Sequence, residues 1–337
     1  MEWEYRAPLM SADTRLNRRQ LIASGALAAG ALAFGPGFWR SALAAPSNPG
    51  PGPYGPLQPA DANGIMLPKG FTSRVIAQGG LPVSGTTYRW HVFSDGQATY
   101  PLPDGGWILV SNSESAPPDA GSSAIRFDRD GNIVAAYRIL GGTRLNCAGG
   151  ATPWGTWLSC EEFDDVDDGG LEAGQVWECD VLGQRPAVAH PAMGRFSHEA
   201  SVVDPEGQRV YMTEDQGDAG FYRYTPESYP DLSSGVLEIA TVAADGSVSW
   251  TRVDPEARPT QPRKQVPHST KFARGEGMWF DSGVVYLVTT SDDKVHAYDV
   301  RIAEGLRDVE LPDDREQAMS TWYRTLNDEV VDWHRSA

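Results

Sequence analysis

Acidic residues recur in this sequence where apolar runs end, and one cysteine lies in a glycine-rich segment between them. The candidate metal ligands are Cys147, Glu161, Glu162, Glu199, Glu214, Asp215 and Glu276. Calcium binds several carboxylate oxygens, iron(III) also accepts carboxylates, and a thiolate favours a transition metal over calcium. Each acid taken alone is more typical of a solvated turn. Taken together, these residues predict a site for several cations.

The segment FARGEGMWF, residues 272–280, combines a guanidinium group with a carboxylate. Arg274 precedes Glu276 by two positions, so both side chains would point to the same side of an extended strand. An arginine fork matches a phosphoryl oxygen, and the neighbouring carboxylate could hold a metal that polarises it. A plain surface salt bridge is the alternative interpretation.

The sequence lacks the motifs of several other catalytic sites. It contains no GxSxG elbow, no HExxH pair, no P-loop and no EF-hand calcium loop. The 6 histidines include no pair at zinc-ligand spacing. A serine hydrolase, a zinc hydrolase and a P-loop enzyme are therefore disfavoured.

A strand–loop–strand pattern that could position these residues occurs four times. The apolar strands with polar or acidic ends are GWILVSNSES, TWLSCEEFDD, RVYMTEDQGD and VVYLVTTSDD. With Leu109, Leu158, Met212 and Leu287 taken as equivalent, the spacings are 49, 54 and 75 residues. Such periods predict the blades of an all-β propeller, with a β-sandwich as the alternative. Propeller blades would bring their acidic strand ends together around a central channel.

The composition describes a soluble globular protein with a core, since 40% of the 337 residues are hydrophobic and 22% are charged. Residues 45–337 contain 23 basic and 42 acidic side chains, a formal charge of −19. This balance disfavours nucleic acid as a partner. It favours bound cations, although an acidic surface that keeps an exported protein soluble is equally common.

The chain is predicted to divide into four parts. Residues 1–44 contain Arg18-Arg19, a short Ala- and Gly-rich segment and a cleavage site after Ala44, which indicate a twin-arginine signal peptide. A Pro/Gly-rich linker over 45–68, the propeller over 69–299 and a polar tail over 300–337 follow. We therefore expect export to the periplasm or the medium by the twin-arginine machinery. We expect no stable membrane span after cleavage.

The odd number of cysteines leaves their pairing open. Cys160 and Cys179 lie in two strand-like segments that could be hairpin neighbours, so a disulfide between them is one possibility. Cys147 lies in NCAGG, which is expected to be a loop where a thiolate could meet a metal.

Several of these motifs resemble those of the PhoX-like alkaline phosphatases. The resemblance covers residues 71–299, and its segments are NCAGGATPWGTWLSCEE, GRFSHEA, YMTEDQGDAGFYRY, FARGEGMWF and DGQATYPLPDGGWILVSNSE. It implies a six-bladed propeller, export, and hydrolysis of phosphomonoesters by an iron pair bridged with calcium. By the same resemblance, Cys147 corresponds to the iron-binding thiolate, and Glu162, Glu199 and Glu276 to metal ligands.

The resemblance also assigns supporting roles. Arg274 would face the phosphate, while Glu161, Glu214 and Asp215 would bind ions that cannot be individually assigned. Arg195 and His198 would orient or support the metal held by Glu199.

The sequence departs from the family pattern after Asp299, where the blade pattern gives way to a polar tail and a late acidic motif is missing. This departure predicts an incomplete propeller with weak phosphatase activity.

The expected protein is a monomeric exported hydrolase that uses Ca2+ and Fe3+ on a small phosphate ester. A non-catalytic propeller that binds calcium or a partner, and a calcium-dependent propeller lactonase, are the alternatives.

Overall fold

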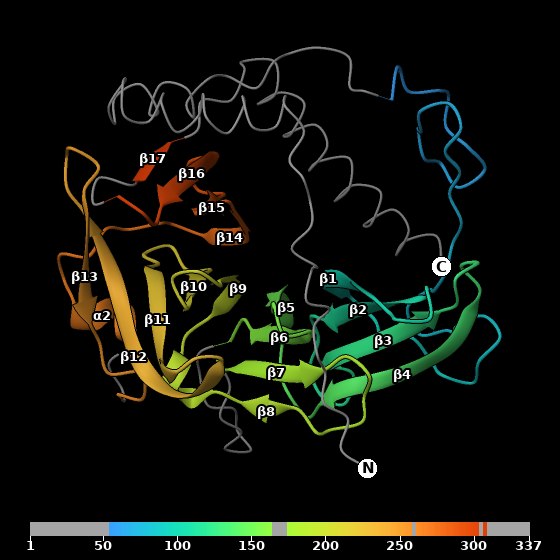
Figure 1. Ribbon diagram of the computed structural model, residues 1–337, viewed down its shortest axis with the longest axis horizontal. Helices are drawn as coiled ribbons and strands as arrows, with labels where there is room; N and C mark the ends of the chain where they lie inside the picture. Colours follow the sequence, from blue (N-terminus) through green and yellow to red (C-terminus); the bar gives the residue numbers. More distant parts are fainter. Residues whose placement is uncertain (1–53, 164–173, 258–260, 303–305, 309–337) are drawn as a thin grey trace, which may run out of the picture. The chain divides into compact units, whose positions relative to one another are not determined.

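The computed structural model describes residues 54–163, 174–257, 261–302 and 306–308, and nearly all of its regular structure is β (Figure 1). The predicted signal peptide lies outside the described residues, as does the tail after residue 308. The predicted linker is described only from residue 54. Among the described residues, no helix is both long and apolar enough to cross a bilayer.

Four antiparallel sheets are each formed by strands that follow one another in the chain. The first sheet contains β1 (Ser94–Pro101), β2 (Trp107–Ser113), β3 (Gly121–Phe127) and β4 (Ile133–Gly141). The second contains β5 (Asn146–Ala151), β6 (Thr156–Glu161), β7 (Val176–Asp180) and β8 (Val188–Ala189). The third contains β9 (His198–Asp204), β10 (Arg209–Glu214), β11 (Phe221–Ser228), β12 (Asp231–Val242) and β13 (Val248–Arg252). The fourth contains β14 (Gly275–Asp281), β15 (Val284–Thr289), β16 (Lys294–Asp299) and β17 (Leu306–Asp308).

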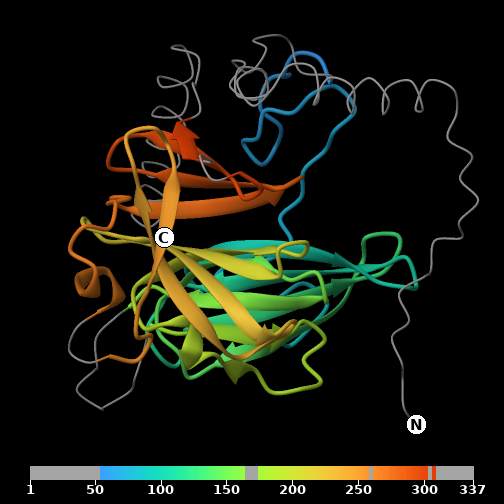
Figure 2. The ribbon, with the colours of Figure 1, turned by 60° about the vertical axis from the view of Figure 1, so that its left-hand side comes forward.

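The first strand of each sheet contacts the first strand of the next sheet, so that β5 contacts β1, β9 contacts β5 and β14 contacts β9 (Figures 1 and 2). Consecutive four- or five-stranded meanders that face inward with their first strands are propeller blades. The predicted all-β propeller is therefore confirmed, and the β-sandwich alternative is wrong. The described residues form four blades, so the sixfold count stays a prediction. In this part of the chain no sheet combines an early strand with a late one.

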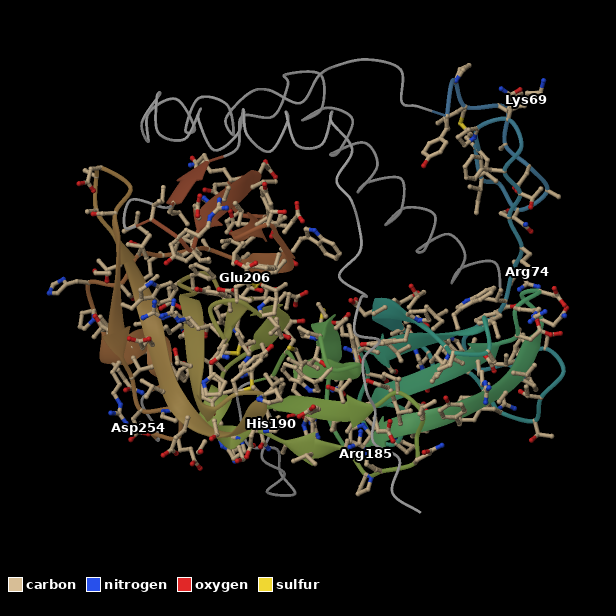
Figure 3. The ribbon with its side chains drawn as sticks, viewed as in Figure 1. Lys69, Arg74, Arg185, His190, Glu206 and Asp254 are labelled. Carbon is tan, nitrogen blue, oxygen red and sulfur yellow. The ribbon has the colours of Figure 1, made fainter. Side chains whose placement is uncertain are left out.

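Residues 71–93, which precede the first blade, form no additional blade in the described structure. Val83 and Trp90 instead pack with Ile125 and Phe127 of β3. Arg74 donates to the carbonyl of Gly131, in the turn between β3 and β4 (Figure 3). This segment thus belongs to the packing of blade one.

The apolar core lies between neighbouring blades, because alternate side chains of a strand point to opposite faces. On β6, Trp157 packs with Ile108 and Val110 of blade one. Its neighbour Leu158 packs in the cluster that contains Met212 of blade three. Blade two is therefore held on both faces by its neighbours.

The same alternation determines whether Cys160 and Cys179 can form a disulfide. In the β6–β7 pairing Cys160 is opposite Val176, whereas Cys179 is opposite Trp157, three positions further along β7. The two thiols therefore enter different core clusters. All three cysteines are free, so the disulfide considered above is not formed, although the two strands are hairpin neighbours.

All four inner strands carry a β-bulge at the same register position. Two inner-strand residues oppose one residue of the second strand, and the bulged pairs are Asp95-Gly96, Cys147-Ala148, Glu199-Ala200 and Glu276-Gly277. This register makes Ser111 and Ser159 the equivalents of Met212 and Leu287. The predicted equivalence is therefore wrong in two blades: Leu109 lies two positions before the true equivalent, Ser111, and Leu158 lies one position before Ser159. The prediction aligned apolar residues, whereas blades one and two have a serine at this register position.

The glycines of NCAGG serve close strand packing. The segment is strand β5 and not the predicted loop. A Cβ atom on Gly150 would lie 1.8 Å from the carbonyl oxygen of Ser201 on β9. The backbones of β5 and β9 can approach this closely only without a side chain at residue 150.

We predict that Gly150→Ala destabilises the protein by about 1–3 kcal/mol or more, because the added methyl group forces β5 away from β9. Gly217→Ala is the matched control, since a Cβ atom there would meet nothing within 4 Å. Urea unfolding of both variants measures the difference. Equal midpoints for Gly150→Ala and the wild type would contradict the close packing.

Candidate metal centre

The four bulges and the four adjacent strand ends place their side chains around one centre. The first residues of the bulges, here called the bulge positions, are Asp95, Cys147, Glu199 and Glu276. The residues that directly follow the second strands, here called the strand-end positions, are Glu114, Glu162, Asp215 and Thr290.

Each strand-end residue is fixed by the same backbone hydrogen bond. Its N–H donates to the carbonyl oxygen of the residue two places before the bulge position, at 2.8–3.1 Å. The acceptors, in blade order, are Phe93, Leu145, Ser197 and Arg274. Three of these acceptors, Phe93, Leu145 and Arg274, have positive φ angles of 48°, 45° and 54°. The positive φ angle of Arg274 thus recurs at the equivalent residues of blades one and two.

Two groups of side chains lie close enough to share a cation. The ligand atoms of Cys147, Glu162 and Glu199 lie within 4.8 Å of one another, as do those of Asp95, Glu114 and Cys147. The Cys147 thiol donates to Oε1 of Glu199 at 3.4 Å. We call these five residues together with Asp215 and Glu276 the carboxylate–thiol cluster. Cys147 belongs to both groups and lies between them.

Burial and mutual repulsion disfavour the charged forms of this cluster. Burial, followed by repulsion from Asp215 and Glu114, raises the pKa of Glu162 to about 7. Burial raises the pKa of Glu199 well above its usual value, and the charges of Glu276 and Glu162 add to the effect. Burial and the charge of Glu199 also raise the pKa of the Cys147 thiol. A bound cation would reverse these shifts, because it favours the ionised forms.

Arg274 provides the positive charge next to this cluster. Its Nε and Nη2 atoms donate to the two carboxylate oxygens of Asp215, both at 2.7 Å. Nη2 also lies 3.7 Å from Oε1 of Glu276, and the Arg274 side chain is 53% exposed. The predicted proximity of Arg274 and Glu276 is therefore present, although Arg274 precedes β14 and does not lie within a strand.

The fourth blade has a hydroxyl group where the others have a carboxylate. Thr290 occupies the strand-end position, and its Oγ1 donates to Oε1 of Glu276 at 2.7 Å. This bond fixes the carboxylate of Glu276 beside Arg274.

The structure places Glu161 and Glu214 outside the cluster. Oε1 of Glu161 accepts from the N–H of Arg144, and Oε2 accepts from the N–H of Gln175. Glu214 accepts from the Tyr222 hydroxyl at 2.7 Å and from Arg263 Nη1 at 2.5 Å. Each precedes a strand-end residue, so strand alternation turns it away from the centre. Both carboxylates anchor neighbouring segments of chain instead.

His198 and Arg195 also lie away from the cluster ligands. The His198 ring is buried against Phe196, with ring centroids 3.6 Å apart, and its Nε2 lies 3.0 Å from the carbonyl oxygen of Gly194. Burial lowers the pKa of His198 to about 4, so the ring is neutral at pH 7. The charge of Arg195 acts on Glu161, whose pKa it lowers against the larger effect of burial. Any support that these residues give to Glu199 is indirect.

Asp95 and Glu114 are cluster members that the sequence analysis did not select as ligands. Glu114 ends the apolar run GWILVSNSE, so it carries the same signal as Glu162 and Asp215. Asp95 carries no such signal, because a β-bulge cannot be recognised in the sequence SDGQAT.

The second and fourth bulges are each supported by a side chain from the preceding blade. Asn112, which opposes the first bulge, donates to the carbonyl oxygens of Cys147 at 3.0 Å and Ala148 at 2.7 Å. Thr213, which opposes the third bulge, donates to the carbonyl oxygen of Glu276 at 2.7 Å. These bonds set the height of blade two against blade one and of blade four against blade three.

A family model described as alkaline phosphatase PhoX matches residues 110–324, well over half of the chain. The chain belongs to the PhoX alkaline phosphatase family. The match includes all the cluster residues except Asp95. No curated protein sequence matches the chain.

Similar solved structures are distant from this PhoX-family chain. A nidogen/laminin complex matches with 14% identity and a TM-score of 0.32, over 65% of this chain and 80% of the other. A glucose dehydrogenase matches with 13% identity and a TM-score of 0.39, over 66% and 74%. The Cps50 (Swd1) β-propeller domain of Myceliophteria thermophila matches with 13% identity and a TM-score of 0.24, over 65% and 87%.

We predict that Arg263→Met destabilises the protein by about 3–5 kcal/mol, because it leaves the buried carboxylate of Glu214 without its cation. The double variant Arg263→Met/Glu214→Gln should recover much of this loss, since the uncompensated charge is gone. Urea unfolding of the single and double variants measures the coupling. Additive losses would show that Arg263 and Glu214 do not act as a pair.

Proposed function

We propose that this chain is an exported, metal-dependent phosphomonoesterase whose active site is the carboxylate–thiol cluster with Arg274. The observation that supports this proposal best is the placement of Asp95, Cys147, Glu199 and Glu276 at one register position in four blades. Membership of the PhoX family adds the reaction class.

The donors of the cluster fit the two metals that the family resemblance implies. Cys147, Glu162 and Glu199 combine a thiol with carboxylates, a donor set that suits iron. Asp95, Glu114, Asp215 and Glu276 offer the oxygen ligands that calcium prefers. Bound iron and calcium would supply Lewis-acid polarisation of a phosphate ester and activation of a hydroxide nucleophile.

Arg274 is assigned to the phosphoryl group. Arginine has five N–H donors, and Asp215 uses two of them, so donors remain for phosphoryl oxygens. The half-exposed guanidinium can neutralise negative charge that grows on these oxygens in the transition state. Asp215 restricts the rotation of the guanidinium, and Thr290 holds Glu276 next to it.

The cellular placement belongs to the same proposal. The twin-arginine signal over residues 1–44 would carry the chain across the membrane already folded, which suits a metal site assembled from four blades. The substrate would then be a small phosphate ester in the periplasm or the medium.

Elemental analysis of the purified protein, combined with a p-nitrophenyl phosphate assay in added calcium, tests the function. We expect iron and calcium together with ester hydrolysis. Calcium without any turnover would support the non-catalytic propeller, and calcium with lactone hydrolysis would support the lactonase. A protein free of metal and of activity would contradict the proposal.

We predict that Cys147→Ala and Glu276→Gln each remove metal from the protein, because one lost anionic ligand leaves the remaining donors too weak. Glu206→Gln is the matched control, since Glu206 is an exposed acid in the turn between β9 and β10 (Figure 3). Metal content per chain is the measurement. Unchanged iron and calcium in both cluster variants would refute the ligand assignment.

We predict that Arg274→Ala lowers kcat/KM by about 100-fold while metal content stays at the wild-type level, because the guanidinium binds the phosphoryl group and no metal. Arg126→Ala is the control, since Arg126 forms an exposed ion pair with Asp104 on blade one. Loss of metal from Arg274→Ala, with normal turnover per bound cluster, would contradict this role.

A further inference from the structure

The bulge of blade two, Cys147-Ala148, is bonded to blade one by a single side chain. Asn112 donates from Nδ2 to the carbonyl oxygen of Cys147 at 3.0 Å and to that of Ala148 at 2.7 Å. A bulge leaves its extra residue outside the strand ladder, so its backbone groups need such partners. Because the backbone sets the direction of the Cα–Cβ bond, the position of this bulge also sets the direction of the Cys147 thiol.

Gly96 of β1 leaves room for the same bulge. A Cβ atom on Gly96 would lie 2.7 Å from the Cα atom of Ala148 and 2.9 Å from the carbonyl oxygen of Cys147. The φ angle of Gly96 is not in the left-handed region, so backbone conformation does not require glycine there. The close contact between the blades does require it. Gly96 thus lets the bulge approach blade one, and Asn112 bonds it there.

The amide of Asn112 can point in only one direction. Nε1 of Trp157 donates to Oδ1 at 2.9 Å, and an indole N–H group can only donate. The carbonyl oxygens at the other end can only accept, so Nδ2 must face the bulge. The hydroxyls of Ser122 and Ser159 also donate to Oδ1. Since Asn112 is fully buried, any rotation of its amide would leave polar groups without partners.

The same contact recurs between blades three and four. Thr213 is the equivalent of Asn112, since each opposes the bulge of its own blade. Thr213 donates to the carbonyl oxygen of Glu276, the bulge position of blade four, as Asn112 donates to that of Cys147. In both pairs of blades, therefore, the preceding blade holds a candidate metal ligand through the ligand's own carbonyl group.

We propose that Asn112 is a positioning residue for the Cys147 thiol, and that through it the affinity of the carboxylate–thiol cluster for a transition metal depends on blade one. This inference rests on the proposed function, since the cluster must bind metal. Cys147 belongs to both groups of close ligand atoms, so its position matters to each. A thiolate favours a transition metal, whereas calcium binds oxygen. A displaced bulge therefore weakens the binding of a transition metal and leaves calcium binding largely unchanged.

Cobalt(II) is a probe that tests this role without turnover. A thiolate ligand gives Co2+ a charge-transfer band in the near ultraviolet, and carboxylate ligands do not. Cys160 and Cys179 are buried in core clusters, so the band reports Cys147. The full chain, freed of metal with a chelator, is titrated with Co2+ alone and separately with Ca2+ alone. Cys147→Ala should show no band at any cobalt concentration.

We expect Asn112→Leu to weaken Co2+ binding by about 10–100-fold and to remove the band from the cobalt that still binds, because the bulge loses both of its donors. Calcium binding should change little. Asn112→Thr keeps one donor, as Thr213 does in blade three, and should restore much of the affinity and of the band. If Asn112→Leu fails to fold, Asn112→Asp decides the question, since it has the same shape and its carboxylate cannot donate.

Ile108→Ala is the matched control for stability. Ile108 is buried between the same two blades, and its apolar side chain cannot bond to the bulge. The variant should lower the urea midpoint through the cavity that it creates, yet keep the cobalt band. Thr213→Val removes the equivalent bond to the bulge of blade four and should likewise keep the band of Cys147.

Two outcomes would overturn the role of Asn112 alone. One is wild-type cobalt affinity with an intact band in Asn112→Leu. The other is a loss of cobalt affinity that follows the urea midpoint alike in Asn112→Leu and Ile108→Ala, which would show a purely structural effect. A wild-type chain that shows the band but hydrolyses no p-nitrophenyl phosphate would refute the proposed function and not the positioning. A wild-type chain that binds no Co2+ would refute both.

Discussion

The β-bulge shared by all four inner strands is the constraint on which the site depends. A regular strand would alternate its side chains, so a one-residue difference between blades would send a ligand to the wrong face. Because each bulge opposes two residues to one, Asp95, Cys147, Glu199 and Glu276 leave their strands at the same height. Asn112 then bonds blade one to the bulge of blade two, and Thr213 bonds blade three to the bulge of blade four, so the blades of each pair cannot shift independently.

Neighbouring acids in this chain have opposite roles, and strand alternation separates them. Glu214 pairs with Arg263 and accepts hydrogen bonds from Tyr222 and from the N–H of Gly220, and so it stabilises the loop that begins at Asp215. The next residue, Asp215, faces the centre and holds Arg274. Burying several unpaired carboxylates at one centre costs stability, whereas pairing them with protein donors or cations offsets that cost. The fold thus supplies protein donors to Glu161 and Glu214, and Arg274 pairs with Asp215. Burial instead raises the pKa of Glu162 and Glu199, a cost that a bound cation would offset.

The sequence predicts the blades and much of the site, but it does not predict which residues of different blades occupy the same register position. Apolar strands that end in acids point to Glu162 and Asp215, and the segment FARGEGMWF points to Glu276, and all three lie in the cluster. They could not reveal Asp95, because a bulge arises from pairing between strands and leaves no periodic signal. The apolar pattern also aligned Leu109 with Met212, although the true equivalent is Ser111. NCAGG looked like a loop because glycine-rich segments usually are loops, while here the glycines serve contact between two strands.

Blade four differs from the other three blades at two positions of the site, and these differences make one side of the site less negatively charged. In three blades an acid directly follows the second strand, whereas in the fourth Thr290 follows it, which removes one negative charge. The position occupied by Phe93, Leu145 and Ser197 in the other blades carries Arg274 here, which adds a positive charge. Both changes lower the repulsion that a phosphate anion would meet at the cluster. If the cluster binds a phosphate ester as we propose, the anion therefore meets the least repulsion on the side of blade four, where the equivalence between blades is broken.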